Sequence, residues 1–364
     1  MAIPFAALPK VSLHEHLDGC VRLATVLELS QEHGLPLPAD TVESLGDWIA
    51  ERTNGGSLER YLESFTLTTG VMQSAAGIHR VAYEYVLDQA ADGVVHAEVR
   101  WAPELCVEGG LSLEEAIEAA SAGIADATRT LRSAGTEIEV TQILSGMRQS
   151  NRVEEVAGLA LRYRDAGIVA FDIAGPEAGF PPSRFAETFD RLRAEWMPVT
   201  IHAGEGDGLA SVQSALRDGH ALRLGHGVRL AEDLTRTEDG WSLGRTAEWV
   251  RDRGVALETS PTSNLHTGVF AQWGATMADH PFARLYELGF AVTVNTDNKL
   301  MSGTTLSNEL SVLTDSFGYG LADLEVFQLT AAGALFSDPS ARTRVTARIR
   351  AGFDAVRSAG QQQP

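Results

Sequence analysis

Two histidines separated by a single residue, His14 and His16, are the first residues in the sequence whose type and spacing could support chemistry. They end an apolar run, and alternate side chains of a strand point to the same face. Both imidazoles should therefore face one side while Glu15 faces the other. Two imidazoles at close range form half of a site for a borderline metal such as zinc. Alone, the pair also fits two ordinary solvated or hydrogen-bonded histidines.

Polar residues also end three later apolar runs. His202 is followed by a turn that carries Glu205, His226 stands between two glycines, and Asp297 follows the last run. Read singly, Glu205 is an ordinary exposed loop residue and His226 an incidental turn residue. Together, however, four of the ten histidines and one aspartate occupy such ends. We therefore predict a metal site that leaves a position open for water, the mark of a catalytic zinc. Its ligands would be His14, His16, His202 and Asp297.

A second metal, bridged by a modified lysine, would require a lysine at the end of the fourth run. That run reads Phe-Asp-Ile-Ala-Gly at 171–175. The lysines of the chain are Lys10 and Lys299, and neither stands there. We therefore expect one zinc ion per chain.

Strand-like runs that could hold these residues alternate with Ala-, Leu- and Glu-rich segments of helical periodicity, such as 113–131 and 153–165. Eight strands separated by helices predict an α/β fold with a parallel sheet, closed into a (β/α)₈ TIM barrel. An open doubly wound sheet is the alternative, but no Gly-x-Gly-x-x-Gly follows the first run. The carboxyl ends of barrel strands form the functional face. The expected strands are 11–17, 93–101, 137–144, 168–173, 198–202, 221–224, 255–259 and 290–295.

Two segments depart from this alternation within what we expect to be a single domain, residues 1–364. Residues 21–85 are longer than one helix requires, and we expect a helical insertion that forms a lid or wall over one barrel end. After about residue 340 we expect an arginine-rich helix and a frayed polar tail.

Composition restricts the partners of the chain. A net charge of −20 disfavours nucleic acid and anionic membranes and favours a neutral or cationic small molecule. No run reaches the ~18 apolar residues of a membrane helix, and residues 1–10 lack the features of a signal peptide. The two cysteines, Cys20 and Cys106, form no disulfide framework, so we expect a cytoplasmic protein. The oligomeric state is left open.

The order and spacing of these motifs resemble the adenosine deaminase family from about residue 8 to residue 310. The matching stretches are KVSLHEHLDG at 10–19, FDIAGPE at 171–177, TIHAGE at 200–205, RLGHG at 223–227, SPTSNLHTG at 260–268 and VNTDN at 294–298.

This resemblance implies zinc-dependent hydrolysis of adenosine, and of 2′-deoxyadenosine, to inosine and ammonia. It implies the same four zinc ligands, with Glu205 protonating purine N1 and with His226 and Asp297 positioning the attacking hydroxide. The implied substrate contacts are the Gly175 N–H to purine N3, Asn298 to N7, and His16 with Asp18 at the ribose 5′-hydroxyl.

Two residues depart from the family pattern. Asn298 stands where many members have a second aspartate, and its amide can donate to N7 without carrying an extra proton. Ser260 replaces a common cysteine, and we assign it no role.

Three other functions remain open. One is deamination of a different 6-aminopurine, adenine or aminofutalosine; AMP fits less well because Asp18 would repel its phosphate. Another is hydrolysis of a different C–N or ester bond on the same scaffold. A non-catalytic purine- or zinc-binding protein would not need an open metal position beside Glu205 and His226.

Overall fold

The computed structural model describes residues 3–54 and 58–361 of the chain. Its central strands form two four-stranded parallel sheets within these residues. The first sheet contains, in order, β1 (Lys10–His16), β2 (Val94–Trp101), β3 (Glu139–Met147) and β4 (Ile168–Ala174). The second contains β5 (Thr200–Ala203), β6 (Arg223–His226), β9 (Ala256–Thr259) and β10 (Val292–Val294).

The two sheets meet along both of their edges. A parallel bridge pairs Phe171 of β4 with Val199, just before β5, and another pairs Glu15 of β1 with Asp297, just after β10. At the second seam the Asp297 amide donates to the His14 carbonyl over 3.0 Å. The eight strands therefore follow one another around a ring, as the predicted (β/α)₈ barrel requires.

Helices surround the ring because each one presents an apolar stripe to it. In α6 (Leu113–Ser133) the residues Leu113, Ala116, Ile117 and Ala120 are all buried. Its start is fixed by a capping box in which Ser112 and Glu115 satisfy each other's backbone N–H groups. The outer layer continues with α7 (Val153–Arg162), α8 (Ala186–Ala194), α9 (Leu209–Arg217), α10 (Arg245–Asp252), α12 (Phe282–Glu287), α14 (Leu306–Phe317) and α15 (Leu321–Ala334).

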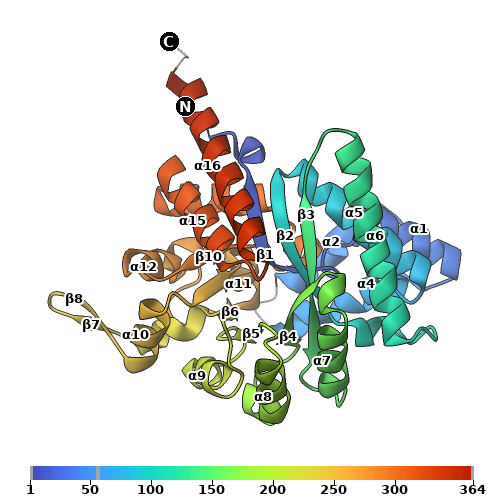
Figure 1. The fold of residues 1–364 in the computed structure, drawn as a ribbon, viewed down its shortest axis with the longest axis horizontal. Coiled ribbons are helices and arrows are strands. Elements are labelled where there is room, and N and C mark those ends of the chain that lie inside the picture. The colour runs from blue at the N-terminus through green and yellow to red at the C-terminus, as the bar shows by residue number, and fades with distance from the viewer. Residues whose placement is uncertain (1–2, 55–57, 362–364) are drawn as a thin grey trace.

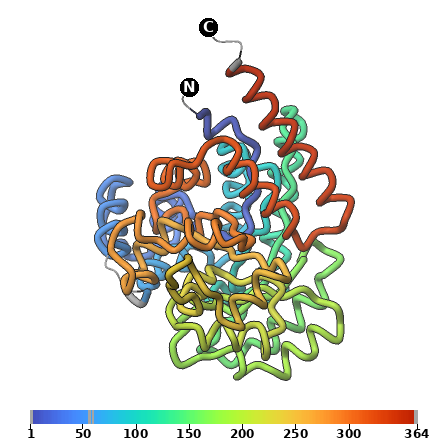
Figure 2. The backbone as a smooth tube through the Cα atoms, turned by 90° about the vertical axis from the view of Figure 1, so that its left-hand side faces the viewer, coloured from blue at the N-terminus to red at the C-terminus, as the bar shows by residue number. Residues whose placement is uncertain are grey.

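The segment between β1 and β2 is helical, as predicted. It contains α1 (Leu23–His33), α2 (Val42–Thr53), α3 (Leu58–Glu63), α4 (Phe65–Val71) and α5 (Ala75–Ala91). Helix α5 packs beside α6 in the outer layer, whereas α2, α3 and α4 contact segments that follow barrel strands: Lys299–Ser302, Pro261–Thr267 and Pro103–Cys106. The first helices of the insertion form the blue group at the left of Figure 2. The part of this insertion at 55–57 lies outside the described residues.

Two features at the periphery differ in how well the sequence indicated them. Helix α16 (Pro339–Gln361) is the expected C-terminal helix, and the expected frayed tail at 362–364 lies outside the described residues. The antiparallel hairpin of β7 (Leu234–Thr237) and β8 (Gly240–Leu243) was not predicted and projects from the barrel (Figure 1). None of the described helices is both long and apolar enough to cross a bilayer.

Candidate metal and active site

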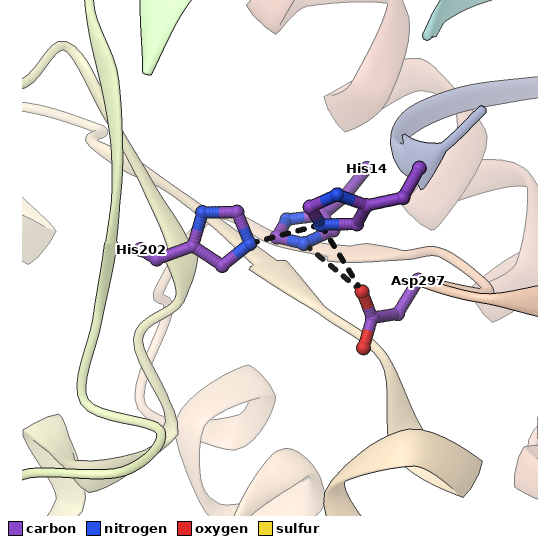
Figure 3. A group of neighbouring side chains, drawn as sticks. His14, His202 and Asp297 are labelled. Carbon is purple, nitrogen blue, oxygen red and sulfur yellow. Dashed lines mark hydrogen bonds and ion pairs between the residues drawn. The ribbon is translucent and has the colours of Figure 1, made fainter. Parts of the chain in front are cut away.

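The four predicted metal ligands converge at the carboxyl ends of the strands. Strand β1 supplies His14 and His16, β5 supplies His202, and Asp297 follows β10. One donor atom from each lies within 4.8 Å of the other three. The Nε2 atoms of His16 and His202 are 3.1 Å apart, and Asp297 Oδ1 lies 3.5 Å from His14 Nε2. Figure 3 shows the labelled side chains directed toward one another.

These donors fit a zinc ion. Zn–N and Zn–O bonds are about 2.0–2.1 Å long, so two atoms that bind one ion lie roughly 3–4 Å apart. The separations of 3.1, 3.4 and 3.5 Å fall in this range. The Nε2 atom of His14 is buried and makes no hydrogen bond to any other described residue. A buried lone pair without a partner costs free energy, which a cation at this point would recover.

Carboxylates orient two of the ligand rings from behind. Glu258 Oε2 lies 2.9 Å from His14 Nδ1, and Asp172 Oδ2 lies 2.8 Å from His202 Nδ1. A carboxylate accepts the Nδ1 hydrogen and leaves the Nε2 lone pair free for a metal. Arg100, from β2, donates to both carboxylates, over 2.6 Å to Glu258 and 3.1 Å to Asp172. Arg100, Asp172 and Glu258 are wholly buried, so each charge is stabilised by its partners in place of water.

Local backbone features make room for this crowding. A Cβ atom on Gly225 would lie 3.0 Å from His202 Cα and 3.1 Å from His14 Cε1, so glycine lets the two strands approach. Two non-glycine residues of the site have left-handed backbones, His226 with φ 61° and Asp297 with φ 60°. Such conformations cost roughly 1–3 kcal/mol each and are found where a site fixes its side chains.

Glu205 lies beside the metal ligands, almost fully buried. Its Oε2 atom is 3.4 Å from His226 Nε2. Burial, together with the negative charges of Asp297 and Glu177, raises the pKa of Glu205 well above its usual value. Its carboxyl group is therefore suited to hold a proton near neutral pH and deliver it.

The turn that carries Glu205 is held by a second buried glutamate, Glu177. Its carboxylate accepts hydrogen bonds from three successive backbone N–H groups: Gly204 at 2.7 Å, Glu205 at 2.9 Å and Gly206 at 2.7 Å. Three charge-assisted bonds to one side chain fix the backbone from which Glu205 projects.

These residues open onto a cavity of about 270 Å³, near the lower end of the range of about 300–1,000 Å³ typical of small-molecule sites. The insertion forms one wall with Leu58, Tyr61, Leu62, Phe65, Thr66 and Thr69. Eight of the nine residues predicted from the sequence line the cavity: His16, Asp18, Gly175, His202, Glu205, His226, Asp297 and Asn298. The ninth, His14, lies buried in the metal cluster.

Two glycines shape the site beyond the metal ligands. Gly175 has φ 95°, and a Cβ atom there would lie 2.5 Å from Gln149 Oε1. A Cβ atom on Gly19 would overlap the Asn298 amide, so glycine lets that side chain pack against the loop after β1.

Neither of the two lysines is near enough to bridge metals: Lys10 donates to the carbonyls of Phe5 and Leu8, and Lys299 Nζ lies 3.8 Å from Glu15, behind the cluster.

Sequence reasoning missed the residues that support the site. Asp172, Glu177 and Glu258 received no role, although Asp172 and Glu177 stand within the quoted motifs. A signal was present, because Asp172 and Glu258 are charged residues inside otherwise apolar runs. His280 also received no role, yet it contacts Asn264, which contacts His226.

Comparison with known proteins gives a consistent picture. A sequence model described as adenosine deaminase matches residues 9–351. The chain is 48% identical to adenosine deaminase from Mycobacteroides abscessus, over 90% of each chain. It is also 48% identical to adenosine deaminase 1 from Streptomyces coelicolor, over 90% of this chain and 82% of that one. An amidohydrolase from Burkholderia ambifaria, solved with bound zinc, has a TM-score of 0.80 at 26% identity, covering 98% of this chain and 93% of that one.

Proposed function

The chain belongs to the adenosine deaminase family, and from this premise we propose that it hydrolyses adenosine, and 2′-deoxyadenosine, to inosine and ammonia with one zinc ion. One observation carries the proposal: three imidazoles and a carboxylate meet beside a buried glutamate whose pKa is raised. Metal binding alone needs no such acid, whereas replacement of an aromatic amino group by water does.

The metal ligands would be His14, His16, His202 and Asp297. A bound zinc ion supplies Lewis acidity that makes water nucleophilic near neutral pH. Glu205 donates its proton to purine N1 as the oxygen of water adds to C6. Carbon C6 becomes tetrahedral, and the proton that the water gives up passes to the exocyclic amino group, which leaves as ammonia when its bond to C6 breaks. The remaining O–H proton returns to Glu205, so the product carries a C6 carbonyl and a hydrogen on N1. Positioned proton transfer of this kind contributes roughly 10²–10⁴-fold.

The base would be held along its other edges by Gly175 and Asn298. The Gly175 N–H is assigned to purine N3 and the Asn298 amide to N7. The Oδ1 atom of Asn298 is buried and has no hydrogen-bond partner among the described residues. The same amide's nitrogen is the group that can donate to N7, which is an acceptor.

Asp18 and His16 are assigned to the ribose. Burial raises the pKa of Asp18 to about 7, so its carboxyl can donate to or accept from a 5′-hydroxyl near neutrality. The wall formed by Leu58, Leu62 and Phe65 would cover the nucleoside and exclude bulk water. Both cysteines are unpaired and buried, which suits a protein working in a reducing compartment such as the cytoplasm.

The proposal is tested by steady-state assays of zinc-loaded enzyme on adenosine, 2′-deoxyadenosine, adenine, AMP and aminofutalosine. We expect the highest kcat/KM for the two nucleosides and loss of turnover on treatment with a chelator. A higher kcat/KM for adenine or aminofutalosine would assign the enzyme to that purine instead. Turnover unaffected by complete removal of metal would contradict the proposal as a whole.

A further inference from the structure

A chain of buried polar contacts leads from His226 away from the cavity. The Nδ1 atom of His226 lies 2.9 Å from Asn264 Nδ2, and Asn264 Oδ1 lies 3.2 Å from His280 Nε2. The backbone N–H of Phe282 donates to His280 Nδ1 over 3.0 Å. The three side chains are at most 3% exposed, so water does not replace these contacts.

The direction of each hydrogen bond in this series of contacts follows from the contact farthest from the cavity, the one between Phe282 and His280. A backbone N–H can only donate, so His280 Nδ1 must accept from Phe282. Burial lowers the pKa of His280 to about 3, so the ring is neutral and carries its hydrogen on Nε2. That hydrogen requires an acceptor, which is Asn264 Oδ1.

A second backbone donor fixes the same amide independently. The N–H of Ser260 donates to Asn264 Oδ1 over 3.3 Å. With two N–H groups directed at one end of the amide, that end must be the oxygen. The Asn264 Nδ2 group therefore faces His226 and donates to its Nδ1 atom.

We propose that Asn264 and His280 are positioning residues that hold His226 in the tautomer with its hydrogen on Nε2. His226 then presents a hydrogen-bond donor to the cavity, where its Nε2 atom lies 3.4 Å from Glu205 Oε2. In this form Nε2 has no lone pair, so it neither binds the metal nor removes a proton from water.

The tautomers of the neighbouring histidines are set the opposite way. Carboxylates lie behind His14 and His202, at 2.9 Å and 2.8 Å from their Nδ1 atoms, and their negative charge favours a hydrogen on the nitrogen that each one faces. Their Nε2 lone pairs are thereby free to bind a cation. The ring centroids of His14 and His226 lie only 4.6 Å apart. The group behind each ring, a carboxylate for His14 and an amide for His226, makes the first a metal ligand and the second a hydrogen-bond donor.

For the reaction, this inference rests on the proposed function. A donor held at His226 Nε2 would stabilise negative charge on the oxygen that adds to C6. Removing one such donor from a preorganised site typically lowers kcat by about 10²–10³-fold.

The experiment is nitrogen NMR on the zinc-loaded enzyme labelled with ¹⁵N-histidine, with His226 assigned by its loss in His226→Gln. We expect the hydrogen on Nε2 in the wild type. Asn264→Asp replaces the amide donor by an acceptor, and we expect the hydrogen to move to Nδ1. With that move we expect kcat to fall by about 10²–10³-fold, with KM and zinc content nearly unchanged. His266→Gln, on the same short helix α11 (Pro261–Thr267), is the matched control. It should change neither the position of the His226 hydrogen nor kcat.

Two results would overturn the proposal. One is a wild-type enzyme with the hydrogen on His226 Nδ1, a measurement that needs no variant to fold. The other is a folded Asn264→Asp variant in which the hydrogen stays on Nε2. The NMR readout does not depend on the substrate, so inactivity toward adenosine would contradict the proposed function and leave this inference standing.

Discussion

His226 and Glu205 face each other across the inner end of the cavity, with 3.4 Å between Nε2 and Oε2. Both side chains are almost fully buried. Glu205 is held from its backbone by Glu177, and His226 from its ring by Asn264. The two groups that would act on the two atoms bonded to C6, N1 and the attacking oxygen, are therefore fixed by separate supports.

Replacing Glu205 by glutamine should remove the proton donor and keep the shape of the site. We expect kcat for adenosine to fall by about 10²–10⁴-fold while zinc content stays at one ion per chain. The wild type is active with Glu205 protonated, so its kcat should decline as pH rises through the raised pKa of this carboxyl. Glutamine cannot lose a proton there, so the alkaline decline should disappear. Near-normal turnover in a fully metallated variant would exclude Glu205 from the chemistry.

His202→Ala removes one imidazole from the cluster and should weaken metal binding. We expect zinc content to fall and turnover to drop by at least about 10³-fold, since a Lewis acid contributes several kcal/mol. A ligand that binds only the folded state stabilises it, so a chelator should lower the melting temperature of the wild type toward that of the variant. His33→Ala, at the exposed end of α1, is the control. A variant that keeps full zinc content would contradict the assignment of His202.

Glu177→Gln should disturb the turn that carries Glu205. A glutamine amide would direct its own N–H group at a backbone N–H, and an unsatisfied buried donor costs about 1–3 kcal/mol. We expect a lower kcat and a lower free energy of unfolding. The exposed Glu187→Gln change on α8 should alter neither.

A double-mutant cycle shows whether Glu177 acts through Glu205. In the Glu205→Gln background, Glu177→Gln should lower kcat little further, because the group it positions is already gone. Fully additive losses in kcat would mean that Glu177 acts on the site by another route.

Glu309 provides a test of pH-dependent stability. It is buried, and burial raises its pKa to about 7 from 4.5. Below pH 4.5 it is protonated in both the folded and the unfolded chain. Between about 4.5 and 7 only the folded chain keeps the proton, so this group's contribution to stability falls as pH rises. The full cost, on the order of 3 kcal/mol, is present above pH 7.

Glu309→Gln should therefore be more stable than the wild type at pH 8 and similar to it at pH 4.5. Glutamine can preserve the local contacts: its oxygen can accept from the Thr262 N–H, and its amide can donate to Thr304 Oγ1. Chemical denaturation at several pH values measures the difference, with exposed Glu248→Gln as control. A difference in unfolding free energy that does not change with pH would refute the prediction.

The sequence was sufficient to predict the barrel and the residues at its functional face. The reason is geometric: His14, His202 and His226 all lie within two residues of the carboxyl end of a strand, and parallel strands of a barrel end at one face. Residues far apart in the sequence, each predicted near the end of its own strand, therefore had to lie close together at that face. The expected strand ends lie within a few residues of the observed ones.

The supporting residues could not be predicted in the same way. Glu177 follows β4 and reaches the turn after β5, and Asn264 of the short helix α11 meets His280 because of the path of the segment between them, which has no periodic signal. Asp172 was within reach of sequence reasoning, because it stands between Phe171 and Ile173 in a strand and must face the barrel interior if they face the helices. The β7–β8 hairpin also had a signal, the Asp239-Gly240 turn.

The bridge between Glu15 and Asp297 joins the first barrel strand to the last. During synthesis, His14 and His16 leave the ribosome early, whereas Asp297 appears only after most of the chain has been made. A nascent fragment therefore lacks the complete set of ligands. Capture of the ion should come late, after the ring has closed, so a truncated product would bind zinc poorly and would not compete with the finished enzyme for it.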